Sequence, residues 1–250
     1  MAGSIVIIFD FDRTLIEDDS DRWVITNMGL NELFHQLLRT LPWNSLMDRM
    51  LEELYNRGKT IDDIVECLKG IPLHPHVIAV IKSAHALGCD LKVVSDSNLF
   101  YIKTILEHNG VYNCFSEITT NPALVDGGRL RIFPYHDGAS SHGCDLCPPN
   151  LCKGRVIQQI QSSISENESK KVIYVGDGMN DFCPTLKLVA GDCIMPRKNF
   201  PLCGRILKNS QLVKAKVYEW SDSEDLARIL LKLINSKSNE DQISLSTTQS

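Results

Sequence analysis

The chain has 250 residues, of which 43% are hydrophobic and 23% are charged, and its formal net charge is −5. This length suffices for a substantial core, and the composition is typical of a soluble globular protein. No run approaches the roughly 18 apolar residues of a membrane span, and no stripe of Lys and Arg indicates nucleic acid. We therefore expect neither a membrane nor a nucleic-acid partner, while the oligomeric state stays open.

The first apolar run is short, has no basic leader and ends at Asp10, so it does not resemble a secretory signal peptide. The sequence also contains nine cysteines. Without a secretory signal, the expected location is the cytoplasm, where thiols stay reduced.

Apolar patterning predicts strands that alternate with helices along most of the chain. The predicted strands are residues 5–11, 90–97, 114–121, 171–177, 192–195 and 216–220. The predicted helices are residues 31–41, 43–57, 61–68, 76–87, 100–108, 155–164 and 225–234. Residues 122–152 are rich in Gly, Pro, His and Cys, and we expect an irregular segment there with a hairpin around residues 126–128.

This alternation is typical of an α/β fold with a doubly wound parallel sheet. The helical block at residues 18–72 interrupts it directly after the first acidic loop, so we predict an inserted helical cap over the carboxyl edge of the sheet. Residues 1–17 and 73–235 would then form the catalytic α/β core. Residues 236–250 contain few apolar side chains, and we expect a disordered tail there.

Three of the predicted strands end in polar side chains, and a lysine precedes the helix between the last two of them. Because the carboxyl ends of parallel strands meet at one edge of the sheet, these groups are expected to converge on one crevice. Carboxylates can hold Mg²⁺ there, while a lysine and small hydroxyls bind phosphate oxygens, so the set predicts phosphoryl transfer. The residues are Asp10, Asp12, Thr14, Ser95, Asp96, Lys153, Asp177 and Asp181.

Four motifs follow the order found in the haloacid dehalogenase-like phosphatases, which the chain resembles over residues 4–235. The segment Asp10-Phe-Asp-Arg-Thr14 matches their D-x-D-x-T signature. Ser95, Lys153 and the segment 176–181 resemble the other three motifs. Residues 10–21, 94–98, 144–153 and 181–184 further resemble a subgroup of phosphoethanolamine/phosphocholine phosphatases, pyridoxal-phosphate phosphatases, and plant proteins described as inorganic pyrophosphatases or thiamine-phosphate phosphatase-like.

The resemblance implies roles for these side chains. Asp10 would be the nucleophile that forms an aspartyl phosphate, and Asp12 would be the acid for the leaving group and the base for hydrolysis. Asp181 would orient Lys153 or a metal-bound water. Phosphate would be bound by Thr14, Ser95 and Lys153, and Mg²⁺ by Asp10, the backbone carbonyl of Asp12, and Asp177.

Asp21 and Asp96 match positions linked in this subgroup to amine-bearing substrates. Arg22 departs from it, because the phosphocholine-type enzymes carry an acid there. The predicted function is therefore a Mg²⁺-dependent phosphatase for a small phosphomonoester with a cationic head, such as phosphocholine, phosphoethanolamine or thiamine phosphate. The alternative is an inorganic pyrophosphatase, which an inward-facing Arg22 would favour. A phosphotransferase and a non-enzymatic phosphate-binding protein are further alternatives.

Each of these residues also has an ordinary structural reading. Paired acids after a strand can form a turn or cap a helix, and Asp21 and Asp96 can be capping or salt-bridge residues. A glycine pair after the fourth strand is typical of a dinucleotide-binding loop, but the third glycine is missing. Trp23 and Trp43 are expected in the core of the cap, and the alternative is that one of them faces the pocket.

Three cysteines and a histidine lie close together in the irregular segment before Lys153. Their spacing suits a zinc site, and a loop without a core of its own favours a structural metal. The alternative is a set of buried thiols that shield Lys153. The predicted zinc ligands are His142, Cys144, Cys147 and Cys152, whereas Cys67, Cys89, Cys114, Cys193 and Cys203 are expected to be ordinary small hydrophobic residues.

Overall fold

The centre of the protein is a sheet of six parallel strands in the order β3-β2-β1-β6-β7-β8. The structure is a computed structural model that describes residues 5–136, 142–163 and 170–247. The strands are β1 (Ile5–Phe9), β2 (Asp90–Asn98), β3 (Glu117–Asn121), β6 (Lys171–Gly176), β7 (Cys193–Pro196) and β8 (Lys216–Val217). This sheet confirms the predicted doubly wound α/β fold.

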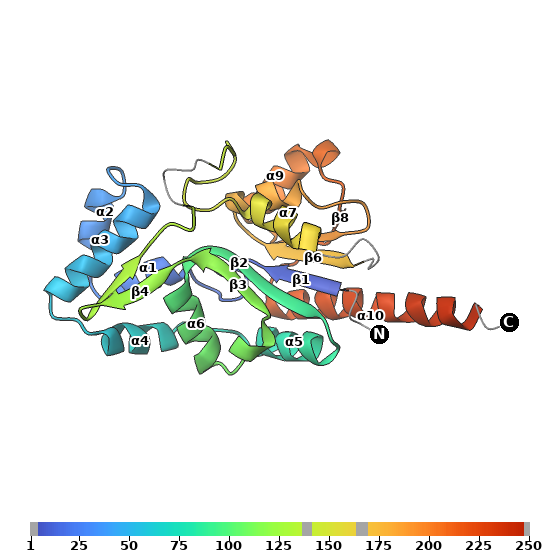
Figure 1. The fold of residues 1–250 in the computed structure, drawn as a ribbon, viewed down its shortest axis with the longest axis horizontal. Coiled ribbons are helices and arrows are strands. Elements are labelled where there is room, and N and C mark those ends of the chain that lie inside the picture. The colour runs from blue at the N-terminus through green and yellow to red at the C-terminus, as the bar shows by residue number, and fades with distance from the viewer. Residues whose placement is uncertain (1–4, 137–141, 164–169, 248–250) are drawn as a thin grey trace.

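Strand β1 illustrates why the sheet carries helices on both faces. Successive side chains of a strand point to opposite faces, and all five side chains of β1 are buried. Its odd-numbered residues belong to one hydrophobic cluster and its even-numbered residues to a second. The first cluster is covered by α5 (Pro75–Ala86), α6 (Leu99–His108) and α10 (Ser223–Thr247), and the second by α7 (Lys153–Ser163) and α9 (Pro201–Lys208), as Figure 1 shows.

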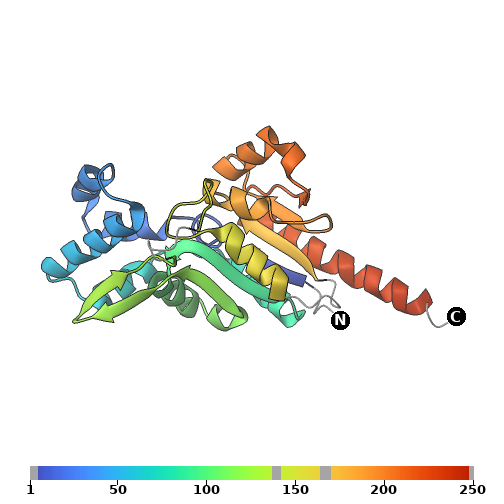
Figure 2. The same ribbon diagram turned by 45° about the horizontal axis from the view of Figure 1, so that its top comes forward.

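Four helices follow β1 and lie together at one end of the sheet (Figure 2). Their apolar side chains, including Leu46 and Met50, join the same hydrophobic cluster as Phe9. The helices therefore continue the core, and the boundaries of the proposed cap at residues 18 and 72 stay a prediction. They are α1 (Ser20–Asn27), α2 (Asn31–Leu37), α3 (Trp43–Asn56) and α4 (Ile61–Lys69).

A hairpin of β4 (Ala123–Asp126) and β5 (Arg129–Ile132) packs against α3 (Figure 2). Arg129 Nη2 lies 2.6 Å from Asp48 Oδ2, and Arg129 Nη1 lies 3.1 Å from Glu52 Oε1. The hairpin forms where the sequence predicted one, but its attachment to α3 depends on pairs that are distant in the sequence.

The C-terminal region differs most from the prediction. Helix α9 was not predicted, and the strand expected at residues 216–220 is reduced to β8. Helix α10 continues to Thr247, so it includes most of the tail predicted to be disordered, whose residues 248–250 lie outside the described residues. The predicted helix ends at Ile234 because apolar residues become sparse after it, but no Gly or Pro follows Ile234 to stop the backbone.

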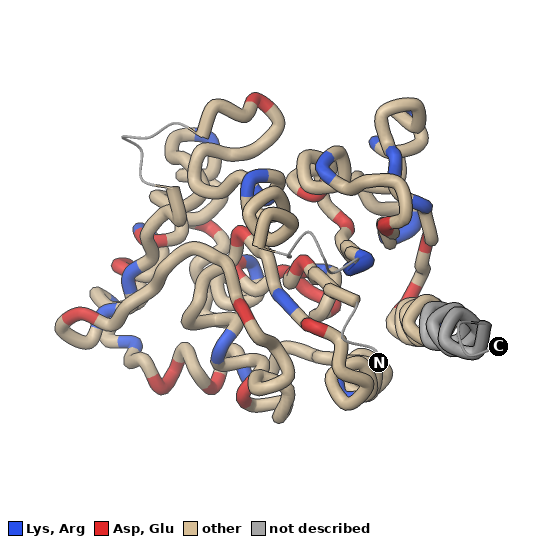
Figure 3. The backbone as a smooth tube through the Cα atoms, turned by 45° about the vertical axis from the view of Figure 1, so that its right-hand side comes forward, with Lys and Arg blue, Asp and Glu red and all other residues tan. Residues whose placement is uncertain are grey.

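Two properties of the chain bear on possible partners. Lys and Arg are interspersed with Asp and Glu along the backbone (Figure 3). None of the helices, within the residues described, combines the length and the hydrophobicity that a membrane crossing needs. The cytoplasmic location and the absence of a nucleic-acid partner stay predictions.

The chain order of the sheet reverses at β1, which lies between β2 and β6. In open α/β sheets, the ligand crevice lies at such a switch point, outside the carboxyl ends of the strands. The segments that follow β1 and β6 and the end of β2 therefore meet at one place.

Candidate active site

A cavity of about 170 Å³ lies at this switch point. Its wall is strongly acidic, because six of its lining residues are aspartates and one is an arginine. Such a concentration of carboxylates requires a compensating cation, proton or substrate charge. The aspartates are Asp10, Asp12, Asp19, Asp21, Asp96 and Asp177, and the arginine is Arg13.

Lys153 connects two of the predicted site residues and is only 1% exposed. Its Nζ lies 2.8 Å from Asp10 Oδ1 and 2.8 Å from Asp181 Oδ1. Burial by itself lowers the pKa of Lys153, but the two carboxylates outweigh burial and raise this pKa above its ordinary value. The lysine therefore stays charged and fixes Asp10 beside the cavity.

Asp181 is fully buried, and both of its carboxylate oxygens accept hydrogen bonds. Oδ1 accepts from Lys153 and, at 2.7 Å, from the hydroxyl of Tyr174. Oδ2 accepts two backbone N–H groups of the loop after β6, at 3.0 and 2.9 Å. Gly176 allows this approach, because a Cβ there would lie 2.6 Å from Asp181 Oδ2. Asp181 is thus placed to hold Lys153 and the loop.

Asp10, Asp177 and Asp181 each place a carboxylate oxygen within 4.8 Å of the others. Burial, followed by the charge of Asp181, raises the pKa of Asp10 above 3.8 and that of Asp177 to about 7. Thr14 Oγ1 donates to Asp177 Oδ1 at 3.4 Å. Because Asp181 already accepts four hydrogen bonds, Asp10 and Asp177 are the pair best able to hold a divalent cation.

Asp12 lies in the loop after β1, and its Oδ1 accepts the backbone N–H of Ser20, the first residue of α1, at 2.8 Å. Burial, followed by the charges of Asp19 and Asp21, raises the pKa of Asp12 well above 3.8. A carboxyl group with a raised pKa keeps its proton to a higher pH than an ordinary aspartate does, and it can transfer that proton to a leaving group.

Asp21 is buried in the first turn of α1, two residues after Asp19, which caps the N-terminus of the helix. Asp21 Oδ2 accepts the indole N–H of Trp43 at 2.8 Å. Asp21 Oδ1 is buried and has no hydrogen-bond partner within the described parts of the chain. Burial, followed by the charge of Asp19, raises the pKa of Asp21 to about 8. The unpaired oxygen marks a place where a ligand cation or N–H group would be stabilised.

Trp43 lines the cavity, so it faces the pocket, which was the alternative to a place in the core of the cap. Trp23, in contrast, lies on α1 and donates its indole N–H to the carbonyl of Cys67 on α4. The Arg22 guanidinium lies 5.2 Å from the centre of the Phe34 ring and 5.6 Å from that of Trp43. Arg22 is not among the residues that line the cavity, and Arg13 is the arginine found there.

Ser95 is fully buried, and its Oγ accepts the N–H of Ser97 at 3.2 Å. The cavity is lined by Asp96 and Ser97, whereas Ser95 is not on its wall. Sequence reasoning missed Ser97, although alternate residues of a strand share a face and the spacing of the two serines was a usable signal.

A second cavity of about 710 Å³, between α3 and the β4–β5 hairpin, shares Trp43 with the first.

The predicted zinc ligands are only partly brought together. Cys144, Cys147 and Cys152 cluster with Cys183, and His142 lies outside this group. The ring nitrogens of His142 contact the carbonyl of Pro148 and the N–H of Cys144. His142 as a zinc ligand stays a prediction, and the structure places Cys183, from α8 (Phe182–Thr185), beside the three cysteines, which short sequence spacing could not reveal.

A comparison with protein families now identifies the chain. A family model described as "Putative Phosphatase" matches residues 5–234. The chain belongs to this phosphatase family. Two Arabidopsis thaliana relatives are each 56% identical: "Inorganic pyrophosphatase 2" over 93% of this chain and 85% of the relative, and "Thiamine phosphate phosphatase-like protein" over 96% and 99%.

The fold of this phosphatase is also that of a solved phosphoserine phosphatase with an analogue of its phospho-aspartyl intermediate. The two structures agree with a TM-score of 0.59 at 18% identity, over 92% of this chain and 98% of the other. The chain is therefore an enzyme of this phosphatase family, and its fold is the one that the resemblance to the haloacid dehalogenase-like phosphatases implied.

Proposed function

We propose that this phosphatase hydrolyses a small phosphomonoester with a cationic head, through an aspartyl phosphate on Asp10 and with Mg²⁺ as cofactor. The observation that carries the proposal is Asp21 Oδ1, which is buried and unpaired in a cavity with five further aspartates. The ionised carboxylate of Asp21 repels a phosphate group, so the compensating positive charge is assigned to the rest of the substrate.

The proposed reaction has two steps. In the first, Asp10 Oδ2 attacks phosphorus, the ester P–O bond breaks, and the leaving oxygen takes the proton of Asp12. In the second, Asp12 takes a proton from water, the water oxygen attacks phosphorus, and the bond to Asp10 breaks to release phosphate. The raised pKa of Asp12 suits a group that first gives and then takes a proton.

The lysine and the hydroxyls orient the phosphate in this proposal. Lys153 holds Asp10 through Oδ1 and is proposed to bind phosphate with Thr14 and Ser95. Mg²⁺ would be held by Asp10, Asp177 and the backbone carbonyl of Asp12, and when bound it offsets the repulsion between phosphate and carboxylates. The buried carboxylates of Asp10 and Asp177, with their raised pKa values, fit such a cation.

Asp21 and Asp96 would bind the cationic head. Trp43 donates to Asp21 and lines both cavities, so a quaternary or primary ammonium beside Asp21 would also lie near an aromatic ring. Each charge pairing is worth about 1–3 kcal/mol in a shielded site, which is about 5- to 150-fold in selectivity.

Inorganic pyrophosphate is the second candidate. Arg13 supports it, because this arginine lines the cavity and its Nη2 lies 3.4 Å from Asp19 Oδ2. One relative is also named an inorganic pyrophosphatase. Pyrophosphate ranks second because it would bring more negative charge to the six aspartates.

The test is kcat/KM with Mg²⁺ for phosphocholine, thiamine phosphate, glycerol phosphate and pyrophosphate. We expect the wild type to prefer the cationic esters, and Asp21→Asn and Asp96→Asn to reduce this preference about 5- to 150-fold. Asp62→Asn, on the exposed face of α4, is the control and should leave all four values unchanged.

A wild-type preference for pyrophosphate that is lost in Arg13→Met would overturn the cationic-head proposal and support the alternative. Equal losses for all substrates in Asp21→Asn and Asp96→Asn would also overturn it. Phosphate release without an added alcohol separates hydrolysis from phosphotransfer.

A further inference from the structure

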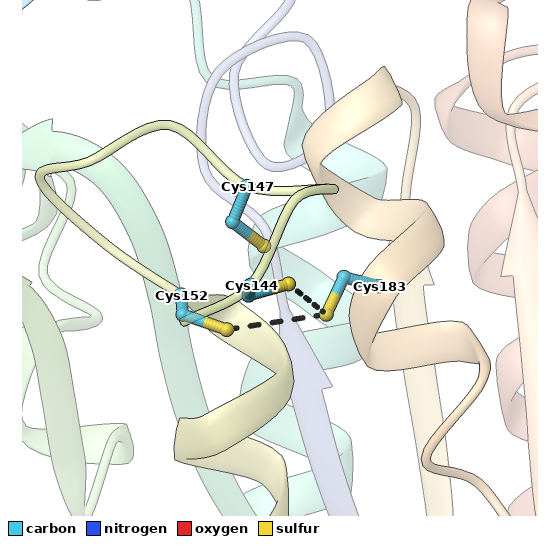
Figure 4. A group of neighbouring side chains, drawn as sticks. All are labelled: Cys144, Cys147, Cys152 and Cys183. Carbon is cyan, nitrogen blue, oxygen red and sulfur yellow. Dashed lines mark hydrogen bonds between the residues drawn. The ribbon is translucent and has the colours of Figure 1, made fainter. Parts of the chain in front are cut away.

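Four cysteine thiols meet where the loop before α7 contacts α8 (Figure 4). Cys144 Sγ lies 3.5 Å and Cys152 Sγ lies 3.9 Å from Cys183 Sγ. Together with the sulfur of Cys147, these atoms all lie within 4.8 Å of one another. The phosphatase reaction proposed above uses none of these thiols.

The spacing of the sulfur atoms suits a tetrahedral metal. Zn–S bonds of about 2.3 Å at tetrahedral angles place sulfur atoms about 3.8 Å apart. The separations of 3.5 and 3.9 Å in this cluster lie on either side of that value, and both are far longer than the ~2.05 Å of a disulfide bond. The cluster therefore has the donor type, the donor number and the spacing of a structural zinc site.

The surrounding chain also fits a metal that holds a loop. Of residues 142–152, only Asn150, Leu151 and Cys152 are buried, so this segment contributes little to the hydrophobic core. In segments without a hydrophobic core, a bound metal commonly stabilises the folded conformation. Cys144 and Cys147 are partly exposed, which leaves a path for an ion to enter.

Gly154 indicates that the sulfur of Cys183 must approach α7 closely. A Cβ at Gly154 would lie 2.4 Å from Cys183 Sγ and 3.3 Å from the Cys183 backbone. Lys153 stands between Cys152 and Gly154 in the sequence, and Asp181 precedes Cys183 by two residues. The cluster thus joins the two segments that carry the Lys153–Asp181 ion pair.

We propose that Cys144, Cys147, Cys152 and Cys183 bind one structural zinc ion as four thiolates. Each thiol gives its proton to solvent as its Zn–S bond forms. The ion ties the loop before α7 to α8 and so helps to hold Lys153 against Asp181. His142 braces the loop through the carbonyl of Pro148 and the N–H of Cys144, without a bond to the ion.

The first test measures the metal content of full-length protein that is purified without chelators or a histidine tag. We expect about one zinc per chain in the wild type, and less than about 0.2 in Cys147→Ser and Cys183→Ser. Cys203→Ser is the matched control, because Cys203 is a buried thiol outside the cluster that donates to Glu219. It should keep its zinc.

The second test needs no variant to fold. Cobalt added to zinc-free wild type should give the visible absorption of a tetrahedral tetrathiolate, and zinc should bleach it. The proposal would be overturned if the purified wild type contains no metal, if its four cluster cysteines react freely with a thiol reagent, and if cobalt gives no such spectrum. Iron in place of zinc in the purified protein would also overturn it. Neither measurement uses activity, so a failure of the zinc site is distinct from a failure of the proposed phosphatase substrate.

Discussion

Asp10, Lys153 and Asp181 form a buried set in which one ammonium serves two carboxylates. Removing the lysine would leave two buried carboxylates without a positive charge beside them, which is strongly destabilising. Removing the charge of Asp10 instead leaves the pair between Lys153 and Asp181 intact. Asp10 is therefore the residue at which chemistry and folding can be separated.

We predict that Asp10→Asn abolishes turnover while the protein stays folded. The amide keeps the volume of the side chain but cannot act as a nucleophile, so kcat should fall by up to about 10⁶-fold. Circular dichroism checks the fold, and phosphate release checks kcat. Near-normal turnover by folded Asp10→Asn, with deamidation excluded by mass spectrometry, would contradict the proposed nucleophile.

Asp21 gives a prediction about stability and pH. Its pKa in the folded protein is about 8, against an ordinary value of 3.8. Between these pH values the folded protein keeps a proton that the unfolded chain has lost, so stability falls as pH rises. Asp21→Asn removes this contribution. From about pH 5.5 to about pH 8, the wild type should lose about 3 kcal/mol more of its free energy of unfolding than Asp21→Asn does.

Urea unfolding at the two pH values without added metal ions checks this prediction. Asp62→Asn, which is exposed on α4, should keep the wild-type pH dependence. Equal pH dependence in the wild type and in Asp21→Asn would show that Asp21 titrates at an ordinary pKa.

Among the elements, the loop between β1 and α1 is held by a residue far away in the sequence. Arg13 has a φ of 56°, in the left-handed region that costs a non-glycine residue free energy. Arg197 Nη1 donates to the carbonyl of Arg13 at 2.6 Å, and Nη2 pairs with Glu17 at 2.7 Å. Arg197 therefore stabilises the loop that carries Asp10 and Asp12.

We predict that Arg197→Met lowers kcat/KM about 10- to 100-fold, because a loop displaced by about 1 Å misplaces the reacting groups. The protein should keep its zinc and its circular dichroism spectrum. Arg57→Met, which removes an exposed pair with Glu53, is the control and should leave kcat/KM unchanged. Unchanged kcat/KM in Arg197→Met would show that the loop holds its shape without this arginine.

For the whole molecule, the sequence predicted features that depend on neighbouring residues and missed those that depend on contacts between distant residues. The strands before Asp10 and Asp177 were predicted because unbroken apolar runs mark buried strands. The contact of Arg197 with Arg13 spans 184 residues and has no local signal. Cys183 was missed for the same reason, since it enters the thiol cluster from α8 rather than from the loop. The direction in which a side chain points was also not predictable. The sequence does not show that Trp43 faces the cavity whereas Arg22 does not.

Metal binding is predicted to affect the whole protein. Mg²⁺ relieves repulsion between the buried carboxylates of Asp10 and Asp177, so it should raise the melting temperature of stripped protein. At about 100 times its dissociation constant, a bound ion adds about 2.7 kcal/mol of stability. Scanning calorimetry checks this, and Asp177→Asn should lose most of the effect.

Chelation should also abolish activity, and Ca²⁺ should inhibit, because its looser coordination misplaces the attacking carboxylate. Full activity of stripped protein in a chelator would contradict a Mg²⁺ requirement.

Peptide mapping of acid-quenched enzyme tests whether Asp10 carries the phosphoryl group during turnover. The wild type is mixed with Mg²⁺ and its best substrate, quenched during turnover and analysed by mass spectrometry. We predict a phosphoryl group on the peptide that contains Asp10, and none on any peptide of Asp10→Asn. A phosphoryl group on another residue during turnover, with Asp10 unmodified, would contradict the mechanism.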